Sequence, residues 1–253
     1  MPAYKLAVIN HTDLSVTDIT NFVEAAREWV GRLAHYWPEI NGTSVRAVAA
    51  DASPAKDEAW VVIAPNTTLA DSLGYHEWTP AGLPTGIVEL DACRQNGVPW
   101  QVPGTHEIGE LLINPRLDKY TAVGYFWYPN EICDPVTSGQ DSIGGVPVAN
   151  AVTPAWFDRM SPTTEKFDLL GHVHAPIPQI PKGGWLEWWD GNSWQNAWGA
   201  DITPQMRSYM NTRRGRRYEM RRGHEQWRYS SVQPTTVPGG NGSSALPRRL
   251  LVG

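Results

Sequence analysis

The sequence predicts an α+β fold in which a mixed sheet carries one long helix and a second, shorter helix. Three observations lead to this prediction. Short runs of apolar and β-branched residues in the N-terminal half are typical of buried strands. A long segment after the first run repeats apolar residues every three or four positions, as amphipathic helices do. A second helical pattern follows the last of these runs, so helices and strands are expected to share one core.

The first expected elements are a strand over residues 6–9 and a helix from Val16 to about Trp37. Ser15 precedes the helical pattern and suits the N-cap position, because its hydroxyl can accept a hydrogen bond from a backbone N–H of the first turn. Apolar residues recur at helical spacing at Val16, Ile19, Phe22, Val23, Ala26, Trp29, Val30, Leu33 and Trp37. Pro38 is expected to end the helix, because proline has no backbone N–H to continue it.

Three more strands are expected before the second helix, over residues 45–49, 59–64 and 86–90. Residues 51–58 are polar and separate the first two of these strands as a turn region. A strand, a helix, further strands and then a second helix give an α+β or αβα layout.

Residues 104–115 hold the pattern that is most informative about function. His106 and Glu110 are four residues apart, so their side chains lie on one face of a helix, with Glu107 beside them. A hydrolytic zinc site needs about three protein ligands, an open position for water and a nearby carboxylate that takes a proton. In the His-Glu-x-x-His helix, the outer residues bind the metal and the Glu is the base. Here Glu110 replaces the second His, which widens the range of possible metals.

The third metal ligand has to come from outside this helix. Glu131 and Asp134 are the best candidates, because they follow the helix closely on a turn that ends at Pro135, and the sequence leaves open which of them it is. A His-Glu-x-x-Glu string also occurs as an ordinary solvated helix face, and this acidic element favours the metal interpretation. His76 lies upstream and is a further metal ligand, a polar partner for substrate or, as we expect, a structural residue of a strand that flanks the site, like Tyr75.

Four segments together resemble a family of zinc metallopeptidases that occurs in bacteria and is often encoded by tailed phages. The segments are residues 71–76, 82–84, 104–115 and 131–135. In that family, a Leu-Gly-Tyr-His stretch precedes a Ser-His-Glu-x-x-Glu helix that ends in Asp-Pro, and a Glu-x-x-Asp element follows. The resemblance covers about residues 4–136.

The resemblance implies a zincin-like metallopeptidase core, in which an edge strand of the mixed sheet lines the substrate cleft. It also implies one zinc ion, held by His106, Glu110 and either Asp134 or Glu131. Glu107 would then be the general base for hydrolysis of a protein or peptide substrate.

One departure from the pattern of that family matters for metal binding. Asn114 stands before Pro115, where the family has Asp. If that Asp helps to hold the metal or supports its ligands, we expect this chain to bind metal weakly or to be catalytically dead.

Composition sets further limits on the class of protein. The 253 residues are 41% hydrophobic, with a mean hydropathy of -0.39, which is enough for one sizeable core plus an extension. We expect no membrane partner, because no apolar run approaches the roughly 18 residues of a membrane-spanning helix. The N-terminus has no signal-peptide pattern, which predicts synthesis in a host cytoplasm. Cys93 and Cys133 are too few for a disulfide framework.

The character of the sequence changes near residue 151, which predicts three parts. These are a metallopeptidase-like domain over residues 1–150, a Trp-rich β extension over residues 151–200 and an Arg-rich C-terminal arm over residues 201–253. Within the extension, residues 183–194 read as a β-hairpin with Asp-Gly at its turn. Five of the 13 tryptophans lie between Trp185 and Trp198. Such a cluster fills a small core or forms a protein interface, or else it is a stacking platform for sugars or bases.

The C-terminal arm has a charge opposite to that of the rest of the chain. From Pro204 onward there are 10 Arg, no Lys and 2 Glu, a net charge of +8, whereas the first 203 residues have a net charge of -13. The Arg residues are interleaved with Tyr218, Trp227 and Tyr229, which favours planar or stacked contacts over a loose electrostatic tail. Such an arm binds nucleic acid or an acidic protein surface, or it is simply a solvated charge run.

These observations give two functional hypotheses. In the first, the chain is a virion-associated protein of a tailed phage with a zinc metallopeptidase-like domain that hydrolyses peptides. In the second, it is a non-catalytic head, neck or tail component that uses the metallopeptidase fold as a scaffold. In both, the Arg-rich arm and the Trp hairpin are expected to contact other virion proteins.

Overall fold

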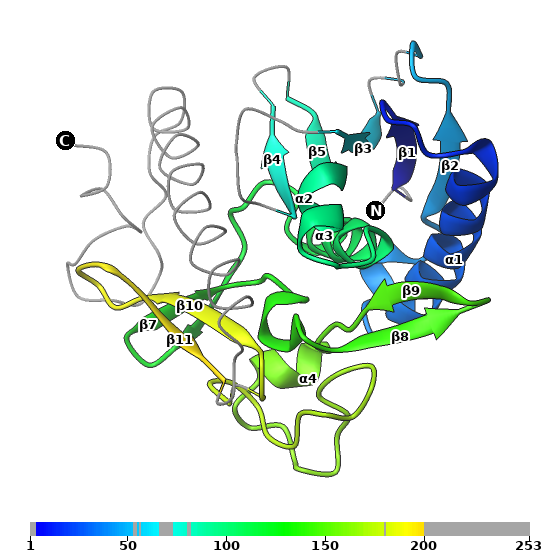
Figure 1. The fold of residues 1–253 in the computed structure, drawn as a ribbon. Coiled ribbons are helices and arrows are strands. Elements are labelled where there is room, and N and C mark those ends of the chain that lie inside the picture. Colours follow the sequence, from blue (N-terminus) through cyan, green and yellow to red (C-terminus); the bar gives the residue numbers. More distant parts are fainter. Residues whose placement is uncertain are drawn as a thin grey trace.

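Five strands form the sheet that carries the candidate site, and they lie in the order β2-β1-β3-β5-β4 (Figure 1). Their bounds are β1 Lys5–Asn10, β2 Ser44–Val48, β3 Glu58–Ala64, β4 Gly74–Trp78 and β5 Pro84–Glu89. The strands β1, β2, β3 and β5 are parallel, whereas β4 is antiparallel to β5 at the edge. In the centre, Val8 pairs with Ala47 on one side and with Val61 on the other. The predicted α+β class with a mixed sheet is confirmed.

This computed structural model describes residues 4–52, 55, 57–65, 73–79, 82–179 and 181–199. The predicted Arg-rich arm, residues 201–253, therefore lies outside the described residues. Among the helices of the described part, none has the length and apolar character that crossing a membrane requires.

The first helix, α1 (Val16–Ala34), begins where the sequence predicts. The Ser15 hydroxyl accepts a hydrogen bond from the backbone N–H of Asp18, and the Asp18 carboxylate accepts one from the backbone N–H of Ser15. This reciprocal pair is a capping box. The helix ends before Trp37, because a residue that precedes proline is disfavoured in the helical conformation, and Trp37 has φ -114 and ψ 76. A short 3-10 helix, Pro38–Ile40, follows.

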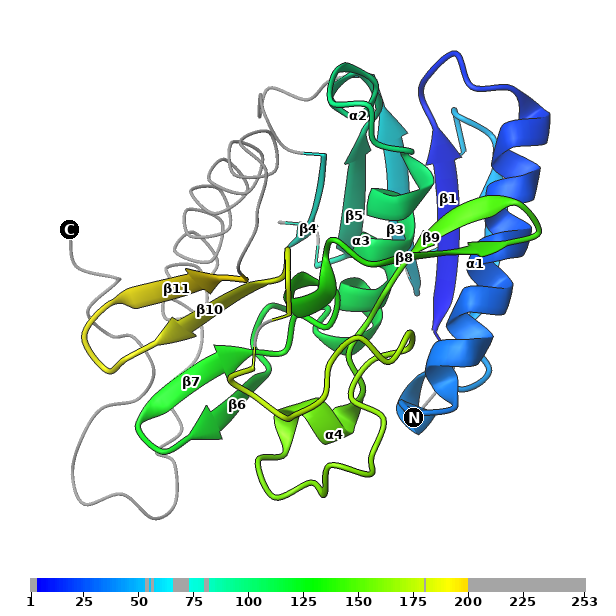
Figure 2. The same cartoon turned by 60° about the horizontal axis from the view of Figure 1, so that its bottom comes forward.

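The second long helix, α3 (Gln101–Ile113), follows the short helix α2 (Leu90–Gln95) and is buried on almost every side. It packs against β4, β5 and β3, and against α1 beside it. The hairpin of β8 (Gln140–Ile143) and β9 (Val146–Ala149) covers α3 and α1 from outside the sheet (Figure 2). The helix that carries the candidate residues thus lies between the five-stranded sheet and the β8-β9 hairpin.

A second sheet is built from two hairpins in the order β11-β10-β7-β6. Its strands are β6 Tyr120–Val123, β7 Phe126–Pro129, β10 Trp185–Trp189 and β11 Trp194–Trp198. The predicted Trp hairpin is confirmed, and the Asp190 carboxylate accepts hydrogen bonds from the backbone N–H groups of Asn192 and Ser193 at its turn. The rings of Trp185 and Trp198 stack across the hairpin, with centroids 5.5 Å apart.

Residues before and after the expected boundary near residue 150 pack against each other. Trp189 of β10 pairs with Trp127 of β7, and one hydrophobic cluster contains side chains from Leu6 to Leu186. The indole N–H groups of Trp29 and Trp37 donate to the carbonyl oxygens of Ala149 and Val152. Between β9 and β10 lies the short helix α4 (Pro154–Phe157), and the 3-10 helix η2 (Asp134–Val136) precedes β8.

Candidate metal centre

Six ionisable side chains meet in one buried cluster between α3, the edge strand β4 and the segment after β7. They are His76 from β4, His106, Glu107 and Glu110 from α3, and Glu131 and Asp134 from the segment that leads into η2. Each of these residues is at most 4% exposed. The structure therefore brings together all the residues that the sequence singled out, and it places His76 among them.

The first group within this cluster is formed by His106, Glu110 and Asp134. The Nε2 atom of His106 lies 2.8 Å from Oε1 of Glu110 and 3.4 Å from Oδ1 of Asp134. One ligand atom from each of the three residues lies within 4.8 Å of the other two. The geometry thus pairs Asp134, rather than Glu131, with the histidine of the helix.

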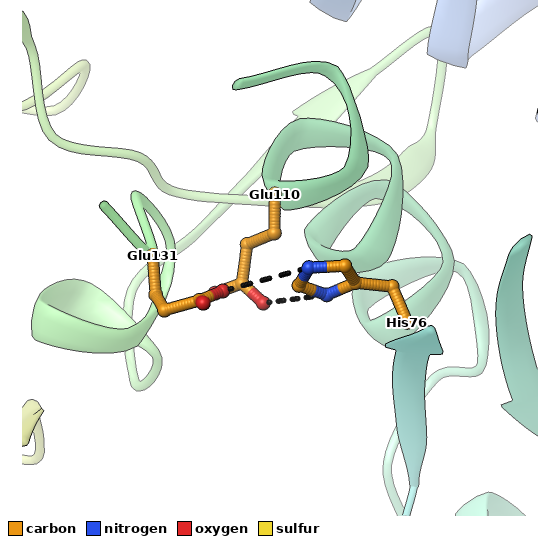
Figure 3. Close-up of side chains that lie close together, drawn as sticks. All are labelled: His76, Glu110 and Glu131. Carbon is orange, nitrogen blue, oxygen red and sulfur yellow. Dashed lines mark ion pairs between the residues drawn. The ribbon is translucent and has the colours of Figure 1, made fainter. Parts of the chain in front are cut away.

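The second group is formed by His76, Glu110 and Glu131, whose side chains are drawn in Figure 3. One ligand atom from each of these residues also lies within 4.8 Å of the other two. The Nδ1 atom of His76 lies 3.5 Å from Oε2 of Glu110, and its Nε2 atom lies 3.8 Å from Oε2 of Glu131. Oε2 of Glu107 is 3.4 Å from the same Nδ1 atom. His76 does belong to a strand beside the site, as expected. Its ring also lies close to the carboxylates of Glu107, Glu110 and Glu131.

Two glycines let the helix approach the sheet closely enough for this arrangement. His76 pairs with Gly86 across β4 and β5. A Cβ atom at Gly86 would stand 3.2 Å from the Cβ of Glu107, and one at Gly74 would stand 3.1 Å from the Cγ of Glu107. Larger residues at these two positions would push Glu107 and its helix away from the strand that carries His76.

Asn114, the residue that departs from the Asp-Pro pattern, supports the cluster from outside. It is the C-cap residue of α3, and its backbone N–H donates to the carbonyl oxygen of Glu110. Its side-chain amide donates to Oε1 of Glu131 at 3.3 Å and to the carbonyl oxygen of Lys119 at 3.4 Å. Its side-chain oxygen accepts from the backbone N–H of Lys119 at 2.8 Å. Asn114 therefore orients a carboxylate of the cluster, as outer partners of metal ligands commonly do.

The charges of the cluster favour a bound cation. Burial by itself lowers the pKa of His76, but the negative charge of Glu131 and the nearby carboxylates of Glu107 and Glu110 outweigh burial and raise this pKa to about 9. Four carboxyl groups share the buried space with two imidazoles. Ionised carboxylates are costly in such a space unless positive charge compensates them, and a protonated His76 or a bound divalent metal ion would each supply such charge.

The distances in the cluster also suit a metal ion. In a tetrahedral zinc site with bonds of about 2.0 to 2.2 Å, neighbouring ligand atoms lie about 3.3 to 3.6 Å apart. The distances of 3.4 Å from His106 to Asp134 and 3.5 Å from His76 to Glu110 fall within this range. The distance of 2.8 Å from His106 to Glu110 is that of a hydrogen bond, so this pair has to open to admit an ion. Histidine nitrogens and carboxylate oxygens are suitable donors for zinc.

Comparisons with known proteins do not assign the chain to a family. No family model and no curated protein matches the sequence. Among solved structures, a chain of the "GM1 bound form of the ECX AB5 holotoxin" matches with a TM-score of 0.24 and 14% sequence identity. The match covers 44% of this chain and about half, 51%, of that chain. A TM-score this low does not indicate a shared fold.

Proposed function

We propose that this chain is a virion-associated protein with a zinc metallopeptidase-like domain, in which His106, Glu110 and Asp134 hold the zinc ion. One observation carries the proposal: these three residues each offer a ligand atom within 4.8 Å of the others, in a buried space. Two of them come from the helical pattern and the third from the acidic element, as the resemblance to phage and bacterial metallopeptidases implies.

The remaining residues of the cluster fit the chemistry of peptide hydrolysis. Zinc, when bound, acts as a Lewis acid and lowers the pKa of a water molecule. Glu107 lies beside the ligands on α3, with its carboxylate in the same buried space, so it is positioned to accept a proton as general base. Oε2 of Glu107 also lies 3.4 Å from Nδ1 of His76.

The position of β4 supports a zincin-like core for this domain. This strand is antiparallel to β5, lies at the end of the sheet and contacts α3. Zincin-type peptidases place an edge strand of a mixed sheet beside the substrate cleft, and an edge strand offers backbone groups to an extended peptide. We therefore assign β4 the role of the strand that lines the cleft.

The depth of the cluster favours a second candidate function. Glu107 is 1% exposed and Glu110 is 0% exposed, whereas a peptidase has to bring a peptide bond to its general base. The alternative is a non-catalytic head, neck or tail component that keeps the metal centre as a structural device. In either case, the Arg-rich arm beyond residue 200 and the Trp hairpin are proposed to bind other virion proteins, and the arm is also suited to nucleic acid.

Measuring the metal content of the protein tests whether the proposed metal centre exists. Full-length protein is purified and its zinc content is measured by mass spectrometry, with His106→Ala and Glu110→Ala as controls. We expect zinc in the wild type and a large loss in both variants, because each variant removes a ligand of the first group. Equal absence of zinc from all three proteins would sink the proposal.

Catalysis and assembly need separate tests. Glu107→Gln should retain zinc and lose cleavage of a panel of denatured proteins, because an amide cannot act as the base. If the zinc-loaded wild type cleaves none of them, the non-catalytic candidate is favoured. Deletion of residues 213–253 should prevent incorporation into phage particles, and normal incorporation would refute the role of the arm.

A further inference from the structure

The two carboxylate oxygens of Glu110 face histidines from different parts of the fold. Oε1 lies 2.8 Å from Nε2 of His106, and Oε2 lies 3.5 Å from Nδ1 of His76. A carboxylate that offers one oxygen to each of two neighbouring sites is suited to bridge two metal ions. Glu110 is also the residue that the two candidate ligand groups share.

The buried ring of His76 is positioned to bind a metal ion, because hydrogen bonds from the described residues do not occupy its nitrogens. It is 2% exposed, and neither ring nitrogen has a hydrogen-bond partner among the described residues. The nearest carboxylate oxygens stand 3.4 to 3.8 Å away, which is longer than an ordinary N–H···O bond. The two ring nitrogens point in different directions, so only one of them can bind an ion. One ligand atom each from His76, Glu110 and Glu131 lies within 4.8 Å of the other two, which fits a single ion among them.

The acidic residues divide between the two histidines. Asp134 groups with His106, and Glu131 groups with His76. A tetrahedral catalytic zinc site uses three protein ligands, so the five residues of the two groups exceed what one such ion needs. Paired metal ions in hydrolytic sites lie about 3.5 to 4 Å apart, a separation that one bridging carboxylate can span.

We infer that the cluster is a dinuclear metal site, in which His76, Glu110 and Glu131 hold a second divalent ion and Glu110 bridges it to the first. This inference rests on the proposed function, because the first ion is the one held by His106, Glu110 and Asp134. Each subsite combines one imidazole with carboxylates, a donor set that suits zinc and manganese. Asn114 holds Oε1 of Glu131, which leaves Oε2 directed at the ring of His76.

Zinc stoichiometry tests the second subsite. Full-length protein is saturated with zinc, dialysed and measured by mass spectrometry, together with Glu131→Gln, Asp134→Asn and, as a matched control, Glu58→Gln. Glu58 is a buried carboxylate that pairs with Arg46 outside the cluster. We expect two ions per chain in the wild type and in Glu58→Gln, and one ion in each of the other two variants.

The other outcomes separate this inference from the proposed function. One ion in the wild type that Glu131→Gln leaves in place would overturn the second subsite and keep the first. One ion that both Glu131→Gln and Asp134→Asn remove would mean a single ion with ligands from both groups, which also overturns the dinuclear site. No zinc in any protein would refute the proposed metal centre as well.

A measurement on the wild type avoids reliance on buried substitutions that impair folding. The full-length protein is loaded with manganese and studied by electron paramagnetic resonance. We expect the spectrum of two magnetically coupled Mn²⁺ ions, because a shared carboxylate couples their spins. The spectrum of isolated Mn²⁺ ions at saturating manganese would overturn the inference.

Discussion

Gly109 of α3 packs so closely against Trp29 of α1 that a Cβ atom at Gly109 would stand 2.7 Å from Cη2 of the indole. The next residue along the chain is Glu110, which both ligand groups share. The contact between the two helices therefore fixes the depth at which the shared carboxylate lies in the fold.

Replacing Gly109 by Ala should destabilise the protein by about 1 to 3 kcal/mol, because the added methyl group overpacks a dense contact. Helix propensity alone predicts the opposite effect, a gain in stability of roughly 1 kcal/mol, because alanine favours a helix more than glycine does. Gly31 on the exposed face of α1 has no atom within 4 Å of a built Cβ, so Gly31→Ala is the matched control and should stabilise. Urea unfolding measures both changes. An equal gain in both variants would show that α3 is not held closely against α1.

Asn114→Asp introduces the residue that the similar metallopeptidases have at this position, and it should weaken this protein. The change removes the amide that donates to Glu131 at 3.3 Å and brings a second negative charge to it. We expect a loss of about 1 to 3 kcal/mol in metal-free protein at neutral pH, because a buried hydrogen-bond partner is lost. Thermal unfolding at neutral and acidic pH measures the loss, which should shrink when the introduced carboxylate is protonated. Tighter zinc binding by this variant, without loss of stability, would instead make residue 114 a metal ligand.

The stability of the metal-free protein should depend on the protonation of His76. Its pKa in the folded protein is about 9, above its ordinary value of 6.5, so protonation favours the folded state. The contribution of His76 to the free energy of unfolding is therefore complete below the ordinary value, and it is lost as the pH rises through about 9.

Denaturant unfolding across this pH range, compared with His76→Gln, isolates that contribution. The variant should show a weaker fall in stability on the alkaline side. Saturating zinc should also weaken the fall in the wild type, because a ligating imidazole has to be neutral. Parallel curves for the metal-free wild type and His76→Gln would contradict the raised pKa.

Metal removal should lower the thermal midpoint of the wild type. A ligand that binds only the folded state at about 1,000 times its dissociation constant adds about 4 kcal/mol of stability. Chelation should remove this increment, and zinc should restore it better than magnesium, which prefers oxygen ligands. The increment should be much smaller in Glu110→Gln. A midpoint that is insensitive to chelation in the wild type would argue against a metal centre.

The local elements of the fold were predictable because their signals lie within short segments. Ser15 marks the start of α1, and Asp-Gly marks the turn of the Trp hairpin. The hairpins β6-β7 and β8-β9 were missed, although their turns carry a signal. Gly124, Gly144 and Gly145 have positive φ, and such glycines between short extended runs are typical of hairpin turns.

The candidate site was predictable only where its residues are close in sequence. His106 and Glu110 share a helix face through their spacing, and the acidic element follows soon after. The role of His76 depends on the antiparallel pairing of β4 with β5 and on the small residue at Gly86, neither of which a local pattern specifies. The division of Glu131 and Asp134 between the two histidines likewise arises from tertiary packing.

The most direct test of the metal centre is anomalous diffraction at the zinc absorption edge, from crystals of the full-length protein grown with zinc. We predict anomalous density inside the cluster, with one peak among His106, Glu110 and Asp134. A second peak is predicted among His76, Glu110 and Glu131. A cluster without anomalous density, in crystals whose zinc is bound only elsewhere, would contradict the account.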